Sequence, residues 1–241
     1  EAPALVQNNR TFHHRLVNGV PVEYPASDGR IIYDTARLVD FDDRHRNDFV
    51  AVNQFTVKEG QHTRRPDIVL FLNGLPIAVV ELKNAADEGA TIWSAFNQLQ
   101  TYEQQIPSLF AFNEIEVISD GLEARLGSLT ASREWFLPWR TIEGEDLAPA
   151  TMPQLEVLIR GVFHKERLLR YLRHFIVFEE DKTTIKKLAG YHQFHAVERA
   201  VAATLAASRP EGDRRGGVVW HTQGSGKSLS MAFFAGCIIL E

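Results

Sequence analysis

The sequence predicts an α/β fold in which a mixed β-sheet is flanked by helices. Segments rich in β-branched and aromatic residues, which are typical of strands, occupy residues 20–24, 30–41 and 48–60. Residues 91–106 then repeat their apolar side chains every three or four positions, which indicates an amphipathic helix, and residues 114–120 again resemble a strand. Strands and helices that alternate in this way are typical of a layered α/β domain.

The composition is that of an ordinary globular protein. The chain has 241 residues, of which 44% are hydrophobic and 24% are charged, with a net charge of −5. Its one cysteine, Cys237, excludes a disulfide framework and a cysteine-based metal site, and it favours a reducing compartment. The apolar runs are shorter than the roughly 20 residues of a membrane-spanning helix. We therefore expect a cytoplasmic protein without a membrane partner. Because the chain begins with Glu1 and ends within an apolar run, we also expect a fragment of a longer protein.

Residues 64–84 predict a β-hairpin with charged groups at its open end. Two apolar runs flank an Asn-Gly turn, Asp67 opens the first run, and Glu81 and Lys83 close the second. Two neighbouring carboxylates repel each other unless a cation compensates, and Mg²⁺ prefers oxygen ligands. We therefore expect Asp67 and Glu81 to bind Mg²⁺. Lys83 would orient or deprotonate the attacking water, or stabilise charge on a phosphate.

The register of this hairpin sets a condition on the site. A strict two-residue turn would pair Asp67 with Val80 and place Asp67 and Glu81 on opposite faces of the sheet. Convergence therefore requires an odd-length loop or a β-bulge, and we predict one. The alternative is that Asp67 and Lys83 are solvated strand ends and that Glu81 is a surface residue. The apolar run that precedes Glu81 is typical of an internal strand and argues against this alternative.

The residues Pro66-Asp67, Glu81 and Lys83 resemble the signature of PD-(D/E)xK nucleases. On the following helix, Gln98 and Tyr102 resemble the Gln-x-x-x-Tyr element of one branch of that superfamily, and their four-residue spacing places them on one face. The resemblance implies that these two residues support the site or the DNA near it.

More broadly, nearly all of the chain resembles the N-terminal part of the restriction (R) subunit of type I restriction enzymes. This resemblance implies a Mg²⁺-dependent endonuclease that cleaves double-stranded DNA. In the complete protein, cleavage of unmodified DNA away from the recognition site would be coupled to ATP-dependent translocation. The implied partners are the modification (methyltransferase) and specificity subunits. The superfamily often carries a further acidic metal ligand on a helix before the sheet, and we expect that helix upstream of Glu1.

A second motif, residues 221–228 (HTQGSGKS), predicts a phosphate-binding loop between a short strand at residues 218–220 and a helix at residues 229–240. In such loops backbone N–H groups and a helix N-terminus face the phosphates. His221 replaces the usual first glycine, as in superfamily 2 helicases, which the type I motor resembles. The residues expected to bind ATP and its Mg²⁺ are Gln193, Thr222, Gly224, Ser225, Gly226, Lys227 and Ser228.

The roles within this second motif follow from the same resemblance. Lys227 would reach the β- and γ-phosphates, and Ser228 would ligate Mg²⁺. Gln193 would contact the adenine, with Tyr191 or Phe194 as a stacking group. The remaining motor motifs do not follow within the sequence, so we expect no ATP hydrolysis by this chain alone.

These patterns predict three regions. Residues 1–150 would form the nuclease domain, residues 151–180 a helical connector, and residues 181–241 the beginning of a RecA-like ATPase domain. Within the connector, residues 154–178 show a helical pattern, and the polar residues 142–153 precede it as a linker. Two other functions are compatible with parts of this pattern. One is a motor whose nuclease-like domain only docks DNA, and the other is a free-standing repair nuclease. The phosphate-binding loop argues against the second.

Overall fold

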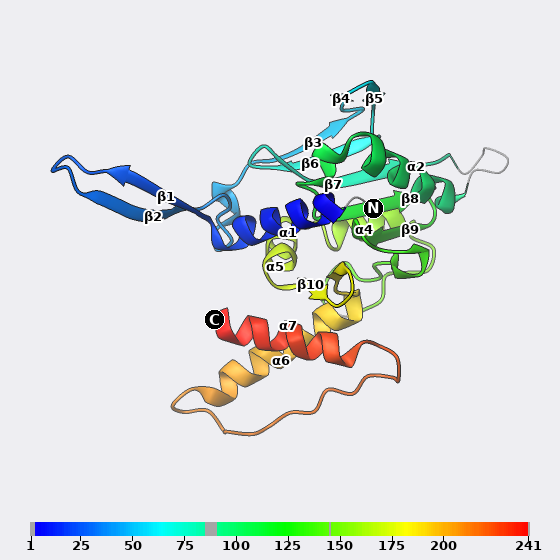
Figure 1. The fold of residues 1–241 in the computed structure, drawn as a ribbon. Helices are drawn as coiled ribbons and strands as arrows, with labels where there is room; N and C mark the ends of the chain where they lie inside the picture. Colours follow the sequence, from blue (N-terminus) through cyan, green and yellow to red (C-terminus); the bar gives the residue numbers. More distant parts are fainter. Residues whose placement is uncertain (1–2, 85–90, 145, 241) are drawn as a thin grey trace.

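A five-stranded mixed sheet forms the centre of the fold (Figure 1). The computed structural model describes residues 3–84, 91–144 and 146–240. The sheet has the order β3-β6-β7-β8-β9, in which β7 and β8 run parallel and all other neighbours antiparallel. This arrangement confirms the predicted α/β fold. The strands are β3 (Phe49–Asn53), β6 (Ile68–Leu72), β7 (Leu75–Leu82), β8 (Ile115–Ser119) and β9 (Ala124–Gly127).

Helices cover both faces of this sheet. On one face, α2 (Ile92–Gln105) and the short α3 (Pro107–Phe110) pack in a buried cluster with Val69 and Val79. On the other face, α4 (Gln154–Arg160) and α5 (Lys165–His174) share a second buried cluster with Val80. Successive strand residues point to opposite faces. A strand buried on both faces therefore needs a continuous apolar run, which explains the sequence that leads up to Glu81.

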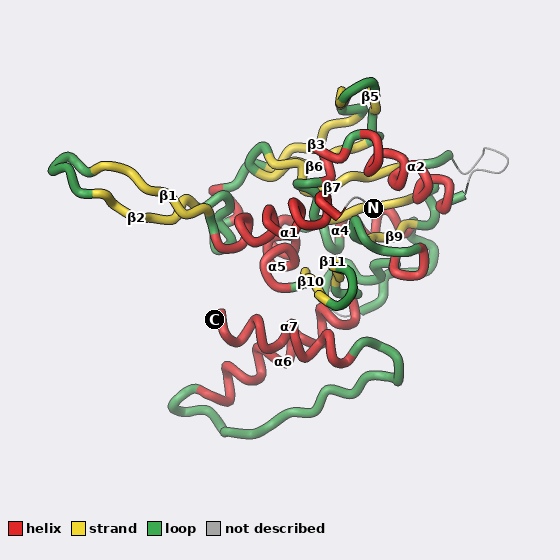
Figure 2. Tube along the Cα trace, viewed as in Figure 1, coloured by secondary structure: helices red, strands yellow, loops and turns green. Residues whose placement is uncertain are grey.

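The N-terminal region contains a helix that the sequence analysis did not predict. This helix, α1 (Pro3–Asn18), contacts α3, and a hairpin of β1 (Val20–Pro25) and β2 (Ile31–Ala36) follows it. The hairpin extends away from the rest of the molecule as an arm (Figure 2). The strand predicted for residues 30–41 therefore ends five residues early.

The segment at residues 48–60 is two strands rather than one. After β3 the backbone of Gln54 adopts a positive φ of 53°, and the chain resumes as β4 (Val57–Glu59), which pairs with β5 (His62–Arg64). A positive φ interrupts a strand because it lies far from the extended region. Two short 3₁₀ helices occur elsewhere: η1 (Arg44–Arg46) precedes β3, and η2 (Arg133–Trp135) follows β9.

The helical pattern at residues 154–178 divides into α4, α5 and a strand. Gly161 follows α4 at a close approach to Trp139, where an added Cβ would lie 2.4 Å from the indole nitrogen. After α5, β10 (Ile176–Glu180) pairs with β11 (Thr184–Leu188). The predicted boundaries between the three regions stay a prediction, and residue 145 of the predicted linker lies outside the described residues.

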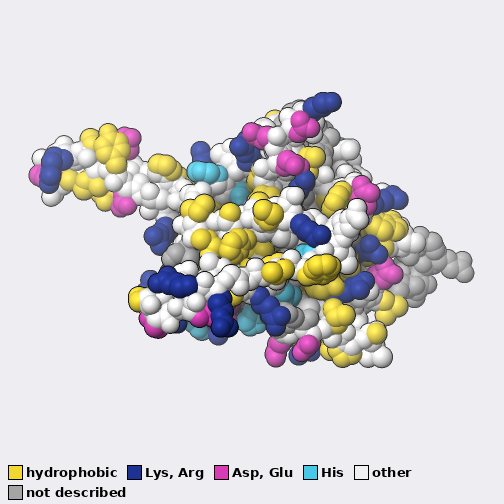
Figure 3. All heavy atoms as spheres, turned by 90° about the horizontal axis from the view of Figure 1, so that it is seen from below, with side chains coloured by type: hydrophobic (Ala, Val, Ile, Leu, Met, Phe, Trp, Pro, Cys, Tyr) yellow, Lys and Arg dark blue, Asp and Glu magenta, His cyan; other side chains and the backbone are white. Residues whose placement is uncertain are grey.

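The C-terminal part consists of two helices and a long loop. The first helix is α6 (Tyr191–Ser208), and α7 (Lys227–Leu240) confirms the helix predicted after the glycine-rich loop. The strand predicted at residues 218–220 is wrong, because these residues form no ladder and Trp220 is 89% exposed. A strand needs a neighbour to pair its backbone groups, and no described strand pairs with this segment. Figure 3 shows hydrophobic side chains gathered over the face seen from the α6–α7 side of the molecule.

Candidate active site

A β-bulge in the β6–β7 hairpin aligns the two carboxylates. The register pairs Leu70 with Ala78 but Phe71 with Pro76, so that Ile77 is an extra residue on β7. Beyond the bulge Ile68 pairs with Val80, and the next position outward on each strand is Asp67 and Glu81. Directly paired residues point to the same face. The predicted bulge is therefore confirmed, and it places Asp67 and Glu81 on the face that α2 covers.

Neighbouring strands hold the Asp67 carboxylate from both sides. Its Oδ2 accepts a hydrogen bond of 2.8 Å from the backbone N–H of Leu82, on β7. Its Oδ1 accepts a hydrogen bond of 2.8 Å from the side-chain amide of Gln54, which follows β3. Each carboxylate oxygen has two lone pairs, so each keeps one for another ligand.

Glu81 is a buried carboxylate with one uncompensated oxygen. Its side chain is 4% exposed, and the ammonium of Lys83 donates a 3.0 Å hydrogen bond to Oε1. Its Oε2 is buried and has no hydrogen-bond partner among the described residues. Burial raises the pKa of Glu81 to about 7, Lys83 opposes this rise, and the charge of Asp67 adds to it. Such a group is a candidate ligand for a cation, which would compensate the buried charge.

The helix α2 brings Tyr102 and Gln98 over the carboxylates. Gln98 donates a 2.7 Å hydrogen bond from its amide to the Tyr102 hydroxyl. Burial raises the pKa of Tyr102, Gln98 opposes the rise, and the charges of Glu81 and Asp67 add to it. Tyr102 packs in the same buried cluster as Val69 and Val79, on the face of the sheet that also carries Asp67 and Glu81. The five residues predicted for the nuclease site therefore lie on one side of the sheet.

Positively charged side chains lie at both ends of α2. At one end, the Arg64 guanidinium donates a hydrogen bond to the side chain of Gln105, the last residue of α2. At the other end of the helix, Arg125 and Arg133 lie over the ring of Trp93, at 5.2 and 5.7 Å from its centroid. A site flanked by cations in this way is suited to a polyanion.

The described residues offer two carboxylates to a cation rather than three. No group of three or more His, Cys, Asp or Glu side chains with metal-binding geometry occurs within residues 3–84, 91–144 and 146–240. The helix that precedes the sheet, α1, contains no Asp or Glu. A further acidic ligand upstream of residue 1 stays a prediction.

The second motif forms a glycine-dependent turn before α7. Gly224 and Gly226 have positive φ values of 81° and 76°, and the Ser225 hydroxyl donates a 2.8 Å hydrogen bond to the Thr222 carbonyl. Lys227 and Ser228 are the first residues of α7. Positive φ angles favour glycine, which accounts for the spacing of the motif.

Gln193 contacts this turn directly. Its buried side-chain amide donates to the carbonyls of Ser225, at 3.3 Å, and Gly226, at 3.1 Å, and it accepts from the Gly190 N–H at 2.9 Å. A Cβ on Gly226 would lie 2.6 Å from the Gln193 nitrogen. The predicted contact of Gln193 with adenine stays a prediction, because its amide binds the loop here.

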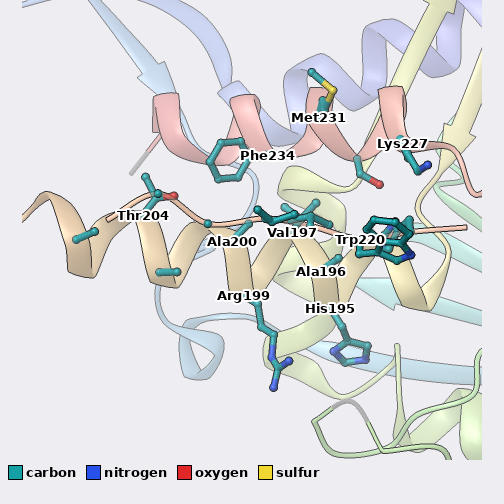
Figure 4. A pocket seen from close by; sticks show the side chains of 18 of the residues that line it. His195, Ala196, Val197, Arg199, Ala200, Thr204, Trp220, Lys227, Met231 and Phe234 are labelled. Carbon is teal, nitrogen blue, oxygen red and sulfur yellow. The ribbon is translucent and has the colours of Figure 1, made fainter. Parts of the chain in front are cut away.

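The two candidate stacking groups differ in their surroundings. Phe194 is 5% exposed and packs against Phe175 at 4.6 Å between ring centroids, so it belongs to the core rather than to a nucleotide site. Tyr191 is partly exposed. A cavity of about 1060 Å³ lies between α6, α7 and the loop that carries Trp220, with Lys227 at one end (Figure 4).

Comparison with known proteins identifies the family of the chain. Residues 1–135 match the family described as type I restriction enzyme R protein N terminus. The chain belongs to this family. Residues 192–241 match the SWI2/SNF2 ATPase family, which supports the assignment of a motor part. None of the helices in the described ranges is long and apolar enough to cross a bilayer.

Relatives within the R protein family align with almost the whole chain. It is 45% identical to the type I restriction enzyme HindI endonuclease subunit of Haemophilus influenzae, over 98% of this chain and 23% of that protein. It is 36% identical to a putative type I restriction enzyme MjaIXP endonuclease subunit of Methanocaldococcus jannaschii, over 97% of this chain and 24% of that protein. The chain thus spans about a quarter of the length of these curated relatives.

Proposed function

We propose that the chain carries the hydrolytic site of a type I restriction endonuclease and cleaves double-stranded DNA with Mg²⁺ as cofactor. The observation that carries this proposal is the convergence of Asp67, Glu81 and Lys83 through the β6–β7 bulge. The same convergence favours a hydrolytic site over a module that only docks DNA.

The residues present fit a divalent cation. Glu81 offers a buried oxygen without a hydrogen-bond partner among the described residues, and Asp67 offers a lone pair on each oxygen. Both are hard oxygen ligands of the kind that Mg²⁺ prefers, and two carboxylates leave coordination positions for water and phosphate. A bound Mg²⁺ lowers the pKa of a water ligand and polarises the phosphate.

The protein side chains then contribute orientation and charge. The Lys83 ammonium, which pairs with Glu81, would orient the attacking water and stabilise the charge that develops on the phosphate. The Tyr102 hydroxyl accepts from Gln98 and keeps its own proton for donation to an oxygen nearby.

In the complete protein we propose that the C-terminal part binds ATP and drives DNA translocation. The match to SWI2/SNF2 ATPases and the turn at Gly224 and Gly226 support this role. Within this proposal Lys227 binds phosphates, Ser228 ligates Mg²⁺, and modification and specificity subunits select the DNA in the cytoplasm. The chain alone is expected not to hydrolyse ATP.

Plasmid nicking by the intact enzyme tests the nuclease assignment. Asp67→Ala and Lys83→Ala should each abolish Mg²⁺-dependent cleavage. The matched controls Asp34→Ala and Lys182→Ala, at exposed positions away from the site, should cleave as the wild type does. Unchanged cleavage by both site variants would remove the assignment and leave a DNA-docking role for this domain.

A further inference from the structure

Gln54 lies directly across from Asp67 in the sheet. The β3–β6 register pairs Asn53 with Ile68, so the next position outward on β3 is opposite Asp67. There the backbone N–H of Gln54 donates a 2.8 Å hydrogen bond to the Asp67 carbonyl. The side-chain amide of Gln54 donates a second bond, also of 2.8 Å, to the carboxylate of the same residue. One residue thus contacts Asp67 through both its backbone and its side chain.

The backbone of Gln54 is in an unfavourable conformation. Its φ of 53° lies in the left-handed region, which is uncommon for a residue with a long side chain. Sparsely populated conformations of this kind are strained and cluster at functional sites. Gln54 lies between β3 and β4, which belong to two different sheets, so its positive φ does not serve to close a hairpin turn.

The two side-chain contacts of Asp67 together fix the plane of its carboxylate. The terminal torsion angle of an Asp side chain has a broad range of allowed values, so a single hydrogen bond leaves the carboxylate free to rotate. Here the Leu82 N–H holds Oδ2 from the β7 side and the Gln54 amide holds Oδ1 from the β3 side. Both donors are neutral, so they orient the carboxylate without neutralising its charge.

We propose that Gln54 is a positioning residue that presents Asp67 to the divalent cation. The inference rests on the proposed function, because it takes Asp67 as a cation ligand. Outer partners that orient a ligating carboxylate typically contribute about 10- to 100-fold to metal affinity or activity. Gln54 acts before DNA arrives, since its bonds to Asp67 are formed in the protein alone.

Metal binding in the absence of DNA tests this role in the full-length protein. The affinity for Mn²⁺, measured by electron paramagnetic resonance, should fall about 10- to 100-fold in Gln54→Leu. Gln54→Gly serves as a second variant, because glycine accepts the positive φ and keeps the backbone bond to Asp67. It should lose affinity to a similar extent. Gln61→Leu, at an exposed position before β5, is the matched control and should bind Mn²⁺ as the wild type does.

Cleavage at increasing Mg²⁺ concentration separates positioning from direct contact with DNA. A positioning role predicts that kcat of the Gln54 variants recovers at high Mg²⁺, whereas KM for DNA stays unchanged. Mn²⁺ affinity within about twofold of wild type in both variants, together with an increased KM for DNA, would overturn the inference in favour of a DNA contact.

A further arm distinguishes this inference from the proposed function. Asp67→Ala should abolish Mn²⁺ binding at the site. If it does and both Gln54 variants bind normally, the nuclease assignment stands and the role of Gln54 is refuted. If Asp67→Ala itself leaves Mn²⁺ binding unchanged, then Asp67 is not a ligand, and both the proposed function and this inference fail.

Discussion

Replacing Glu81 with Gln removes a charge from a buried position, and the expected gain in stability depends on pH. The Glu81 side chain is 4% exposed, and burial raises its pKa from 4.5 to about 7. A shift of this size corresponds to about 3 kcal/mol between the two protonation states. Glutamine resembles the protonated carboxyl in shape and charge, so Glu81→Gln isolates the contribution of the ionised form.

The sign of the effect follows from proton linkage. Because the folded-state pKa is above the unfolded-state value, the folded protein binds this proton more tightly than the unfolded chain. The contribution of Glu81 is fully favourable below pH 4.5 and is lost as the pH rises through about 7. We therefore expect Glu81→Gln to match the wild type near pH 4.5. Above pH 7 the variant should be more stable by up to about 3 kcal/mol.

Urea denaturation of the 241-residue chain in EDTA, at several pH values, measures this difference in the free energy of unfolding. Glu23→Gln, at an exposed position of β1, is the matched control and should show no pH-dependent difference. Adding Mg²⁺ above pH 7 should stabilise the wild type and narrow its difference from Glu81→Gln. A difference between wild type and Glu81→Gln that is the same at pH 4.5 and pH 8 would refute the reasoning.

Three further predictions address the bulge, the core and the flanks of the site. Deletion of Ile77 should abolish Mg²⁺-dependent nicking, because it moves Glu81 to the face of the sheet opposite to Asp67. Retained nicking would contradict this prediction. Lys186 and Glu114 form a fully buried 2.7 Å ion pair, so Lys186→Met should lower the free energy of unfolding by about 3–5 kcal/mol. Glu114→Gln, added to that variant, should restore part of the stability in urea denaturation. Replacing Arg125 and Arg133 with Gln should weaken binding of a DNA duplex and reduce the slope of log K against log salt by about 1 for each phosphate that the protein no longer neutralises; an unchanged slope would exclude a role for these two side chains in binding phosphates.

The sequence was sufficient to predict the hairpin of the candidate site because the residues that indicate it are close together in the chain. The Asn-Gly turn, the apolar runs and the spacing of Asp67 and Glu81 all lie within 21 residues, from 64 to 84. Even the bulge followed from counting residues on either side of the turn, since side chains alternate between faces with a period of two. The position of the extra residue, Ile77, did not follow, because any residue between the turn and Glu81 satisfies the same count.

Features that depend on tertiary contacts were not predictable in this way. The helix α1 has few apolar residues: Leu5, Phe12 and Leu16 lie on one face, but the polar Asn9 occupies the position between them and is buried through its hydrogen bond to the Phe110 carbonyl. The break after α4 arises from the close approach of Trp139 to Gly161, two residues that are distant in sequence. In both cases packing overrides local propensity.

Gln54 shows why part of the site could not be found from the sequence. It lies 13 residues before Asp67 in a strand-like segment, and nothing in its neighbours predicts a positive φ. Its role appears only when β3 and β6 are paired, because the pairing brings its amide to the Asp67 carboxylate. By contrast, Gln98 was found because a helix brings residues four apart onto one face without any long-range pairing.

From the same geometry we predict that cation binding at the proposed site depends on pH. Burial raises the pKa of Glu81 to about 7, and the charge of Asp67 on the adjacent strand adds to this rise. Protonation removes the buried charge of Glu81 at low pH, and a bound cation would compensate it at higher pH. Protons and metal therefore compete for the same oxygens, so metal affinity should increase as the pH rises towards about 7 and level off above it. Neutral donors from both neighbouring strands already orient Asp67. Metal binding should therefore mainly alter the protonation of Glu81 and its ion pair with the Lys83 ammonium.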